Sequence, residues 1–378
     1  MVNICADGNY IFHKTFGIFA GYGNVDPGKV LSKKSDQAMF IRKVATDLCS
    51  SLNNLPSGGR LIFTADSKSW RREIEIENGG YKSNRVKDEN VDWTIFFDLL
   101  DSFGRQLEKM GFIYSKVQRA EGDDLLYGWS NYFNKNGEDC IIVSGDKDLH
   151  QLARYHGKNW TVVWNSNNKK NILTIPENWK KDWLEREVEA SIFDMGAVIS
   201  PDKERLKLLS SKCDINEVDS EFFILNKMFI GDKGDAVPSV WEMRSNSKTM
   251  GFTAKKSESL IEAMNNSDDW KDIKTMDLLE NSDFLNWASG FILRSMKDVD
   301  SSDNRKKVAD NIRRNYKLMW LDSSVLPVDL MESINNEVER GMSLERKNIT
   351  LDRIKILDGT NWITPNYSPS SFDPFANL

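Results

Sequence analysis

The stretch AEGDDLLYGWSNYFNKNGEDCIIVSGDKDLHQL, residues 120–152, decides the fold class. An amphipathic pattern runs over Asp123–Phe133 and is followed by the apolar run CIIVS at Cys140–Ser144. A helical period that gives way to a short β-branched run predicts a helix leading into a buried strand. The stretch therefore predicts one helix–strand unit of an α/β fold, with acidic residues before the helix and after the strand.

The same alternation covers the first half of the chain. Strand-like runs lie at Val2–Ala6, Arg60–Ala65, Phe112–Val117 and Trp160–Trp164, and helical patterns lie at Gln37–Leu52 and Asp92–Met110. Alternation at this spacing predicts a mostly parallel central sheet that is flanked by helices.

The second half has a different texture. After residue 205 strand-like runs become rare, while helical patterns continue at Phe222–Ile230, Ser257–Met264 and Lys306–Trp320. We therefore predict an α/β domain over residues 1–205, a helical domain over residues 206–345, and a C-terminal extension over residues 346–378. A chain of 378 residues is long enough for two domains.

Composition excludes several classes of protein. No run of about 18 apolar residues is present, so we expect no membrane span, and the N-terminal residues lack a secretory pattern. The four cysteines form no CxxC pair, which predicts free thiols in a reducing compartment such as the cytoplasm. The chain has only three histidines, which argues against a histidine-based zinc site. A net charge of −6 argues against a nonspecific nucleic-acid coat protein but leaves a nuclease open.

Acidic residues follow the predicted strands. Asp7 follows VNICA, Asp66 follows RLIFTA, and Asp146 and Asp148 follow CIIVSG. The weaker strand over Phe112–Val117 leads to three more acids, Glu121, Asp123 and Asp124. Because the carboxyl ends of parallel strands meet at one edge of a sheet, these seven acids should gather there.

So many carboxylates cannot lie together ionised without cations, since like charges raise one another's pKa values. Hard divalent cations prefer oxygen ligands, so the pattern predicts two Mg²⁺ ions, with Mn²⁺ as a substitute. Two such ions about 4 Å apart suit the hydrolysis of a phosphodiester. An aspartate after a strand is more often a turn former or a helix cap, and this alternative holds for each acid taken singly.

A further acidic segment, GDKGD at Gly231–Asp235, follows the helical run FFILNKMFI. Pro238 just beyond it predicts a tight turn, as in hairpins between two helices. Its acids are candidates to complete the metal site.

Together these blocks resemble the FEN-type 5′→3′ exonucleases. The resemblance rests on ADGNYIFH (6–13), FTADSKSWRREI (63–74), YKSNR (81–85), AEGDD (120–124), VSGDKDLHQL (143–152) and GDKGDAVPSV (231–240). GDKGDAVPSV and the segment 310–334 are most similar to the phage branch with ribonuclease H activity, and the resemblance covers residues 1–340. Two departures stand out: Ala236 replaces the asparagine of the family's GDxxDN pattern, and TMGFTAKK (249–256) is only a loose substitute for a second hairpin glycine motif.

The resemblance implies a PIN/FEN-like catalytic domain with an arch region over residues 67–109, and a DNA-binding domain of the helix-hairpin-helix type. It implies that one metal lies among Asp7, Asp66, Glu121, Asp123 and Asp146, and the other among Asp148, Asp232, Asp235 and Asp124. Lys82 and Arg85 are implied as catalytic residues at the scissile phosphate, with Arg71, Arg72, Tyr81 and Lys233 as further nucleic-acid contacts. A solvated helix face for the two arginines, and packing for Tyr81, are the structural alternatives.

The function implied is a Mg²⁺-dependent 5′→3′ exonuclease and flap endonuclease with ribonuclease H activity that removes RNA primers from lagging-strand fragments. Its substrates would be RNA–DNA hybrids, 5′-flap DNA and duplex DNA. The tail Ser370–Phe375 resembles peptides that bind a sliding clamp, with the pair Phe372 and Phe375 as the anchor, and a single-strand-binding protein is a second expected partner. We expect a monomer in the cytoplasm, that of a bacterial host if the protein is viral.

Three rival functions each predict a sequence feature that differs from this chain. A non-catalytic adaptor for branched DNA should have lost some of the acids, all of which are present. A phosphatase with Asp7 as nucleophile usually has a second aspartate where this chain has Asn9. A small ribonuclease of the PIN type would lack the helical domain and the GDKGD segment.

Overall fold

A computed structural model describes residues 2–22, 31–52, 55, 59–76, 79–85, 91–156, 159–166, 171–177, 213–245, 248–271 and 275–345. The chain divides into two compact units. The first comprises Met1–Lys68, Lys87–Val218 and Asp329–Leu378, and the second comprises Ser69–Val86 and Asp219–Val328.

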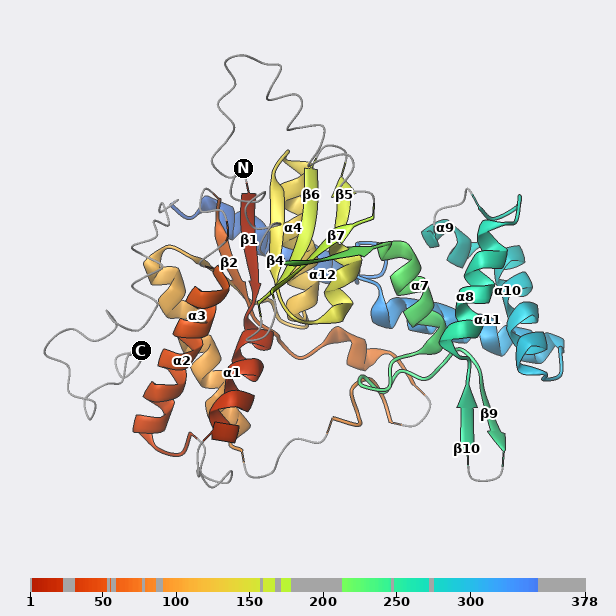
Figure 1. The fold of residues 1–378 in the computed structure, drawn as a ribbon, viewed down its shortest axis with the longest axis horizontal. Helices are drawn as coiled ribbons and strands as arrows, with labels where there is room; N and C mark the ends of the chain where they lie inside the picture. Colours follow the sequence, from red (N-terminus) through yellow and green to blue (C-terminus); the bar gives the residue numbers. More distant parts are fainter. Residues whose placement is uncertain are drawn as a thin grey trace, which may run out of the picture. The chain divides into compact units, whose positions relative to one another are not determined.

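The first unit is built on one sheet with the strand order β3-β2-β1-β4-β6-β7-β8 (Figure 1). The five strands predicted from the sequence are β1 (Val2–Asp7), β2 (Leu61–Thr64), β3 (Ile113–Ser115), β4 (Asp139–Val143) and β6 (Asn159–Ser166). These five strands are parallel to one another, as predicted. Their carboxyl ends therefore lie at one edge of the sheet.

Three strands of this sheet were not predicted. These are β5 (Arg154–His156) and β7 (Asn171–Pro176), both antiparallel to β6, and β8 (Asp214–Val218), parallel to β7. Strand β8 has the sequence DINEV and contains no buried residue, so it lacks the apolar run by which the other strands are recognised.

Helices α1 (Gly8–Tyr22), α2 (Lys34–Leu52) and α3 (Trp93–Met110) share one core with the sheet. Phe12 of α1 lies at its centre, with ring contacts at 5.5 Å to Phe40, 5.8 Å to Phe96 and 5.6 Å to Phe103. The ends of α3 follow from its sequence. The Asp92 carboxylate accepts the N–H groups of Thr94 and Ile95, and Gly111 ends the helix at φ 102°.

Helix α4 (Gly122–Lys135) covers the other face of the sheet. Trp160, Val162 and Trp164 of β6 point into the core with α1 to α3. The intervening Thr161 donates to Asn134 of α4, and successive strand residues point to opposite faces. Helix α12 (Val328–Ser343) packs on α4, where a Cβ atom at Gly341 would lie 2.7 Å from the Trp129 ring.

The second unit is mainly helical, which confirms the predicted change from strand–helix alternation to helices. It contains a short 3₁₀ helix η2 (Trp70–Glu73), α7 (Ser220–Ile230), a hairpin of β9 (Glu242–Ser245) and β10 (Lys248–Gly251), α8 (Ala254–Asn265), α9 (Thr275–Glu280), α10 (Ser282–Met296) and α11 (Ser302–Met319). These elements enclose a core of their own. The hairpin and the start of α8 take up TMGFTAKK, where Phe252 donates its N–H to the Ser239 hydroxyl.

The two units differ from the predicted domains in two places. Residues 69–86, predicted to lie in the arch of the catalytic domain, belong to the helical unit. Helix α12, predicted to lie in the helical domain, belongs from Asp329 onward to the sheet unit, where Arg340 donates to Glu108 and to the Tyr114 carbonyl. The predicted boundary at 205 and the extension over 346–378 lie outside the described residues.

All four cysteines are free thiols, three of them buried. Within the described residues, no helix is both long and apolar enough to cross a bilayer.

Candidate nuclease site

Three acids stand at the ends of three adjacent strands. Asp7 is the last residue of β1, Asp66 follows β2 by two residues, and Asp146 follows β4 by three. Strand β1 lies between β2 and β4, with Asp7 opposite Thr64 and Ala6 opposite Val143. The parallel register thus brings the three chain turns together at one edge of the sheet, as predicted.

Asp7 is buried, with 5% of its surface exposed. Its carboxylate accepts the N–H of Tyr10 at 2.9 Å and the hydroxyl of Ser144 at 2.8 Å. Burial raises the pKa of Asp7 to about 7, and repulsion from Asp66 and Asp146 adds to the rise, although the two hydrogen bonds oppose it. The acids of the three strands are therefore electrostatically linked, and a cation among them would relieve their repulsion.

The turn after β2 and the start of α4 fix Asp66. The N–H of Gly122 donates to Asp66 Oδ1 at 2.6 Å, and a Cβ atom at position 122 would lie only 2.9 Å from that oxygen. The backbone N–H of Asp66 donates to Asn9 at 2.8 Å. Glycine is required at 122 because the helix start approaches the carboxylate this closely.

The EGDD motif both caps α4 and supplies acids. Glu121 is the N-cap residue, and its N–H donates to Asp124 Oδ2 at 3.0 Å. Asp124 is fully buried, Glu121 is nearly so, and Asp123 is half-buried. The hydrogen bond from the Glu121 N–H to Asp124 shows that these two residues cap the helix, which was the structural alternative. Metal binding by Glu121, Asp123 and Asp124 stays a prediction.

Asp146 and Asp148 are held by a second cap. The Asp146 carboxylate accepts the N–H of Asp148 at 2.9 Å, which starts the 3₁₀ helix η3 (Lys147–Leu152). The N–H of Asp146 donates in turn to Ser144 at 3.0 Å. Ser144 therefore ties Asp146 to Asp7.

Sequence reasoning missed Asn9, Tyr10, Gly122 and Ser144 as supports of the acids. The only signal was their position inside the motifs ADGNYIFH, AEGDD and VSGDKDLHQL, beside the acids themselves.

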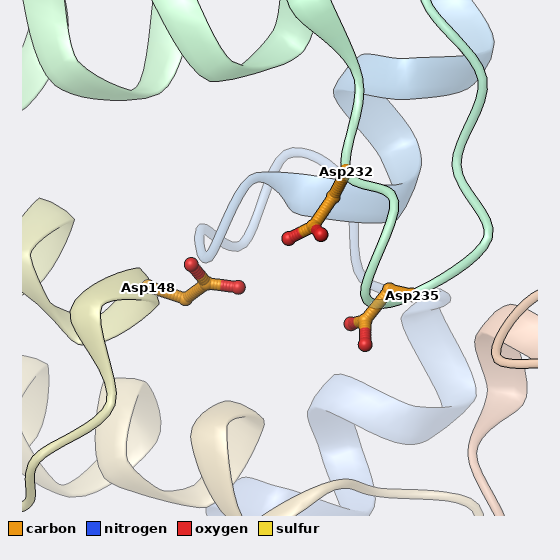
Figure 2. Close-up of side chains that lie close together, drawn as sticks. All are labelled: Asp148, Asp232 and Asp235. Carbon is orange, nitrogen blue, oxygen red and sulfur yellow. The ribbon is translucent and has the colours of Figure 1, made fainter. Parts of the chain in front are cut away.

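In the second unit, Asp232 and Asp235 lie on the GDKGD loop, residues 231–235, which follows α7; Figure 2 draws both side chains together with Asp148 of η3. Asp232 accepts the Lys227 ammonium at 2.6 Å and the N–H of Gly234 at 2.7 Å. Although burial acts in the opposite direction, these donors hold the pKa of Asp232 below its ordinary value. Asp232 is therefore an anion in the neutral pH range.

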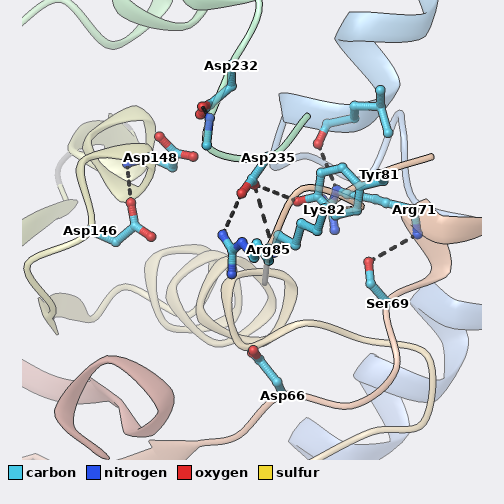
Figure 3. A network of polar contacts seen from close by, with 12 residues as sticks. Asp66, Ser69, Arg71, Tyr81, Lys82, Arg85, Asp146, Asp148, Asp232 and Asp235 are labelled. Atoms are coloured by element: carbon cyan, nitrogen blue, oxygen red, sulfur yellow. Dashed lines mark hydrogen bonds and ion pairs between the residues drawn. The ribbon is translucent and has the colours of Figure 1, made fainter. Parts of the chain in front are cut away.

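Asp235 lies against the YKSNR segment, Tyr81–Arg85, of the same unit (Figure 3). Of the predicted nucleic-acid contacts, Arg72 and Lys233 are exposed. Arg71 and Tyr81 are not, with 1% and 6% of their surfaces exposed. The Arg71 guanidinium donates to the carbonyl of Leu318 at 2.9 Å, so the structure shows packing roles at these two positions.

The donor set is made of carboxylate oxygens and suits a hard divalent cation. Neither histidine nor cysteine stands among the candidate ligands, which disfavours a zinc site of the usual nitrogen and sulfur type.

Comparison with known proteins decides the family. Residues 4–187 match the family model described as the 5′-3′ exonuclease, N-terminal resolvase-like domain. Residues 4–187 therefore form a domain of the FEN-type 5′→3′ exonuclease family. This confirms the resemblance inferred from the acidic motifs, and the matched residues include β1 to β7.

Individual relatives are consistent with the match to the family model. The chain is 24% identical to ribonuclease H of Enterobacteria phage T4 over 202 residues, which are 45% of this chain and 64% of that protein. It is 26% identical to DNA polymerase I of Streptococcus pneumoniae over 204 residues, 53% of this chain and 21% of that one. A 90-residue match at 30% to glutathione reductase of Debaryomyces hansenii covers only 24% and 18% of the two chains and carries no argument. The chain thus spans less than two thirds of each of these relatives.

Among solved structures, the T5 D15 protein co-crystallised with metal ions has a TM-score of 0.50 and 14% identity, covering 90% of this chain and 99% of that one. At this identity the likeness supports the fold alone. It extends beyond the family model into the helical unit.

Proposed function

We propose that this FEN-type chain is a Mg²⁺-dependent 5′→3′ exonuclease and flap endonuclease with ribonuclease H activity. It hydrolyses phosphodiesters of RNA–DNA hybrids, 5′-flap DNA and duplex DNA from the 5′ end. The observation that carries the proposal is the linked set Asp7, Asp66 and Asp146 at three adjacent strand ends, within a domain of the 5′-3′ exonuclease family.

The acids around Asp7 would hold one divalent ion. For a second ion, the ligands expected from the sequence are Asp124, Asp148, Asp232 and Asp235. A bound ion of this kind acidifies a water molecule and stabilises the charge that develops on the phosphate. Ser144 and the Tyr10 N–H keep the Asp7 carboxylate fixed in orientation. Gly122 does the same for Asp66, so the ligands need little rearrangement when an ion binds.

Cationic side chains of the second unit are the expected contacts to the nucleic acid. Arg85 and Lys82 would bind substrate phosphate, since guanidinium groups match phosphate oxygens in pairs. Arg72 and Lys233 are exposed and would contact the nucleic-acid backbone.

The substrate class rests on the relatives. Phage T4 ribonuclease H supports an RNA–DNA hybrid as substrate, and DNA polymerase I supports a role in replication. Together they favour removal of RNA primers from lagging-strand fragments.

The test uses 5′-labelled RNA–DNA hybrid and 5′-flap duplex, with Mg²⁺ and with EDTA. We expect short 5′ products that require Mg²⁺ and that are lost in Asp146→Asn. Asp98→Asn, which removes an exposed acid on α3, is the matched control and should cleave as the wild type does. Tight binding of the flap without cleavage by the wild type would favour the adaptor instead.

A further inference from the structure

The YKSNR segment and the GDKGD loop are joined by contacts that centre on Asp235 (Figure 3). Arg85 Nη2 lies 2.5 Å from Asp235 Oδ1, and Lys82 Nζ lies 3.9 Å from Oδ2. The Tyr81 hydroxyl donates to Oδ2 at 3.1 Å. Both carboxylate oxygens of Asp235 are thus engaged by donors from one short segment.

The backbone takes part as well. The N–H of Lys82 donates to the Asp235 carbonyl at 2.7 Å, and Asn84 donates its side-chain N–H to the Lys233 carbonyl. The Tyr81 ring packs with Val237 and Leu318 in a small buried cluster of the same unit. The contact is therefore a built junction of backbone, ring and charge.

Both sides of this junction have strained backbone. Lys82 has φ 59° and Ala236 has φ 58°, in the left-handed region that residues with a Cβ atom rarely adopt. Such strain persists where the surroundings over-determine the conformation. Two strained residues at one junction indicate that the positions of the Lys82 and Arg85 side chains are functionally constrained.

We propose that Asp235 is a positioning residue for Lys82 and Arg85, and that its carboxylate is shared between these cations and a divalent ion. This inference rests on the proposed function. The Asp235 carboxylate oxygens cannot bind the two cationic side chains and a divalent ion equally tightly at the same time. Ion binding at the GDKGD loop therefore weakens the ion pairs of Asp235 with Lys82 and Arg85. By reciprocity, the cations lower the affinity of the loop for the ion to the same degree.

The test is titration of the full-length protein with Mn²⁺ in the absence of nucleic acid, followed by electron paramagnetic resonance. Arg85→Met removes the closest ion-pair partner of Asp235. The Arg85 side chain is 58% exposed, so the variant should fold. Because exposed ion pairs are partly screened, we expect one Mn²⁺ site to tighten about three- to tenfold. Asp235→Asn should weaken that site.

Lys233→Met is the matched control, since it removes one positive charge from the same loop without an ion pair to Asp235. It should change Mn²⁺ affinity by less than about twofold, through long-range charge alone. Equal shifts in Arg85→Met and Lys233→Met, or no tightening in Arg85→Met, would overturn the proposal.

Hydrogen exchange gives a second readout. Exchange of the Lys82 amide should quicken when the wild type is saturated with Mg²⁺, and in Asp235→Asn without metal. If the junction is purely structural, Mg²⁺ should leave the exchange rate of the Lys82 amide unchanged. That result would contradict the sharing of the Asp235 carboxylate with a divalent ion. Absence of Mn²⁺ binding by the wild type and all variants would overturn the metal-dependent function together with this inference.

Discussion

Single residues carry the chemistry, and Asp7 is the clearest case. Burial beside two further acids raises its pKa to about 7 from an ordinary value of 3.8. The folded protein therefore holds a proton that the unfolded chain has lost between these two pH values. The free energy of unfolding should accordingly fall as pH rises from 4 to 7 when no divalent ion is present.

Asp7→Asn removes this titration. In EDTA at pH 8 the variant should be more stable than the wild type, on the order of 1–3 kcal/mol, because each unit of pKa shift corresponds to about 1.4 kcal/mol. The difference should shrink toward pH 4 and in saturating Mg²⁺. Urea denaturation at the two pH values measures it, and a pH-independent difference would show that charge is not the cause.

Ala236 allows a test of backbone strain. Its φ of 58° suits glycine or asparagine better than alanine, so Ala236→Gly should stabilise the second unit by about 0.5–1 kcal/mol. Ala263→Gly in the regular helix α8 is the control and should destabilise by about 1 kcal/mol. Thermal unfolding compares the two. A loss of stability in Ala236→Gly would mean that the strain is absent.

At the scale of elements, the pairing of α4 with α12 depends on close helix packing. A Cβ atom at Gly341 would lie 2.7 Å from the Trp129 ring and 2.8 Å from Ile113. Gly341→Ala should therefore cost about 1–3 kcal/mol through overpacking.

Gly17 on α1 is the matched helical glycine, since nothing lies within 4 Å of an added Cβ atom. Gly17→Ala should be neutral or stabilise by up to about 1 kcal/mol, because alanine favours the helix. Denaturant titration gives both values. Equal effects at the two positions would contradict the close packing of α4 and α12.

The sequence predicted most of the elements that have a clear apolar period, but α12 was missed although its buried Leu330, Ile334 and Val338 recur every four residues. The five parallel strands and helices α2, α3, α4, α7, α8 and α11 were foreseen, because their apolar residues alternate or recur with a clear period. Helix α1 was missed because its sequence GNYIFHKTFGIFAGY is apolar on nearly all sides, and β8 because it is polar.

For the site, strand-end acids were predictable because parallel topology places them at one edge. The buried state of Arg71 and Tyr81 was not, because it depends on Leu318 and Asp235, which lie far away in the sequence. Local pattern cannot reveal such partners.

At the scale of the whole molecule, the C-terminal tail is the remaining expectation. Residues 346–378 lie outside the described part of the chain, so the proposal for Phe372 and Phe375 rests on sequence alone. Deletion of residues 366–378 should leave basal cleavage intact and remove any stimulation by a sliding clamp. Cleavage assays with and without the clamp test this prediction. Stimulation that persists after the deletion would contradict clamp binding by the tail.

We propose that the clustered strand-end acids make this chain a metal-dependent 5′ nuclease. The most direct test of this proposal is cleavage of the 5′-labelled RNA–DNA hybrid by wild type, Asp146→Asn and Asp98→Asn, each with Mg²⁺ and with EDTA. We expect short 5′ products from wild type and Asp98→Asn in Mg²⁺ alone, and a loss of at least about a hundredfold in Asp146→Asn. Cleavage that persists in EDTA, or in Asp146→Asn at the wild-type rate, would contradict the proposal.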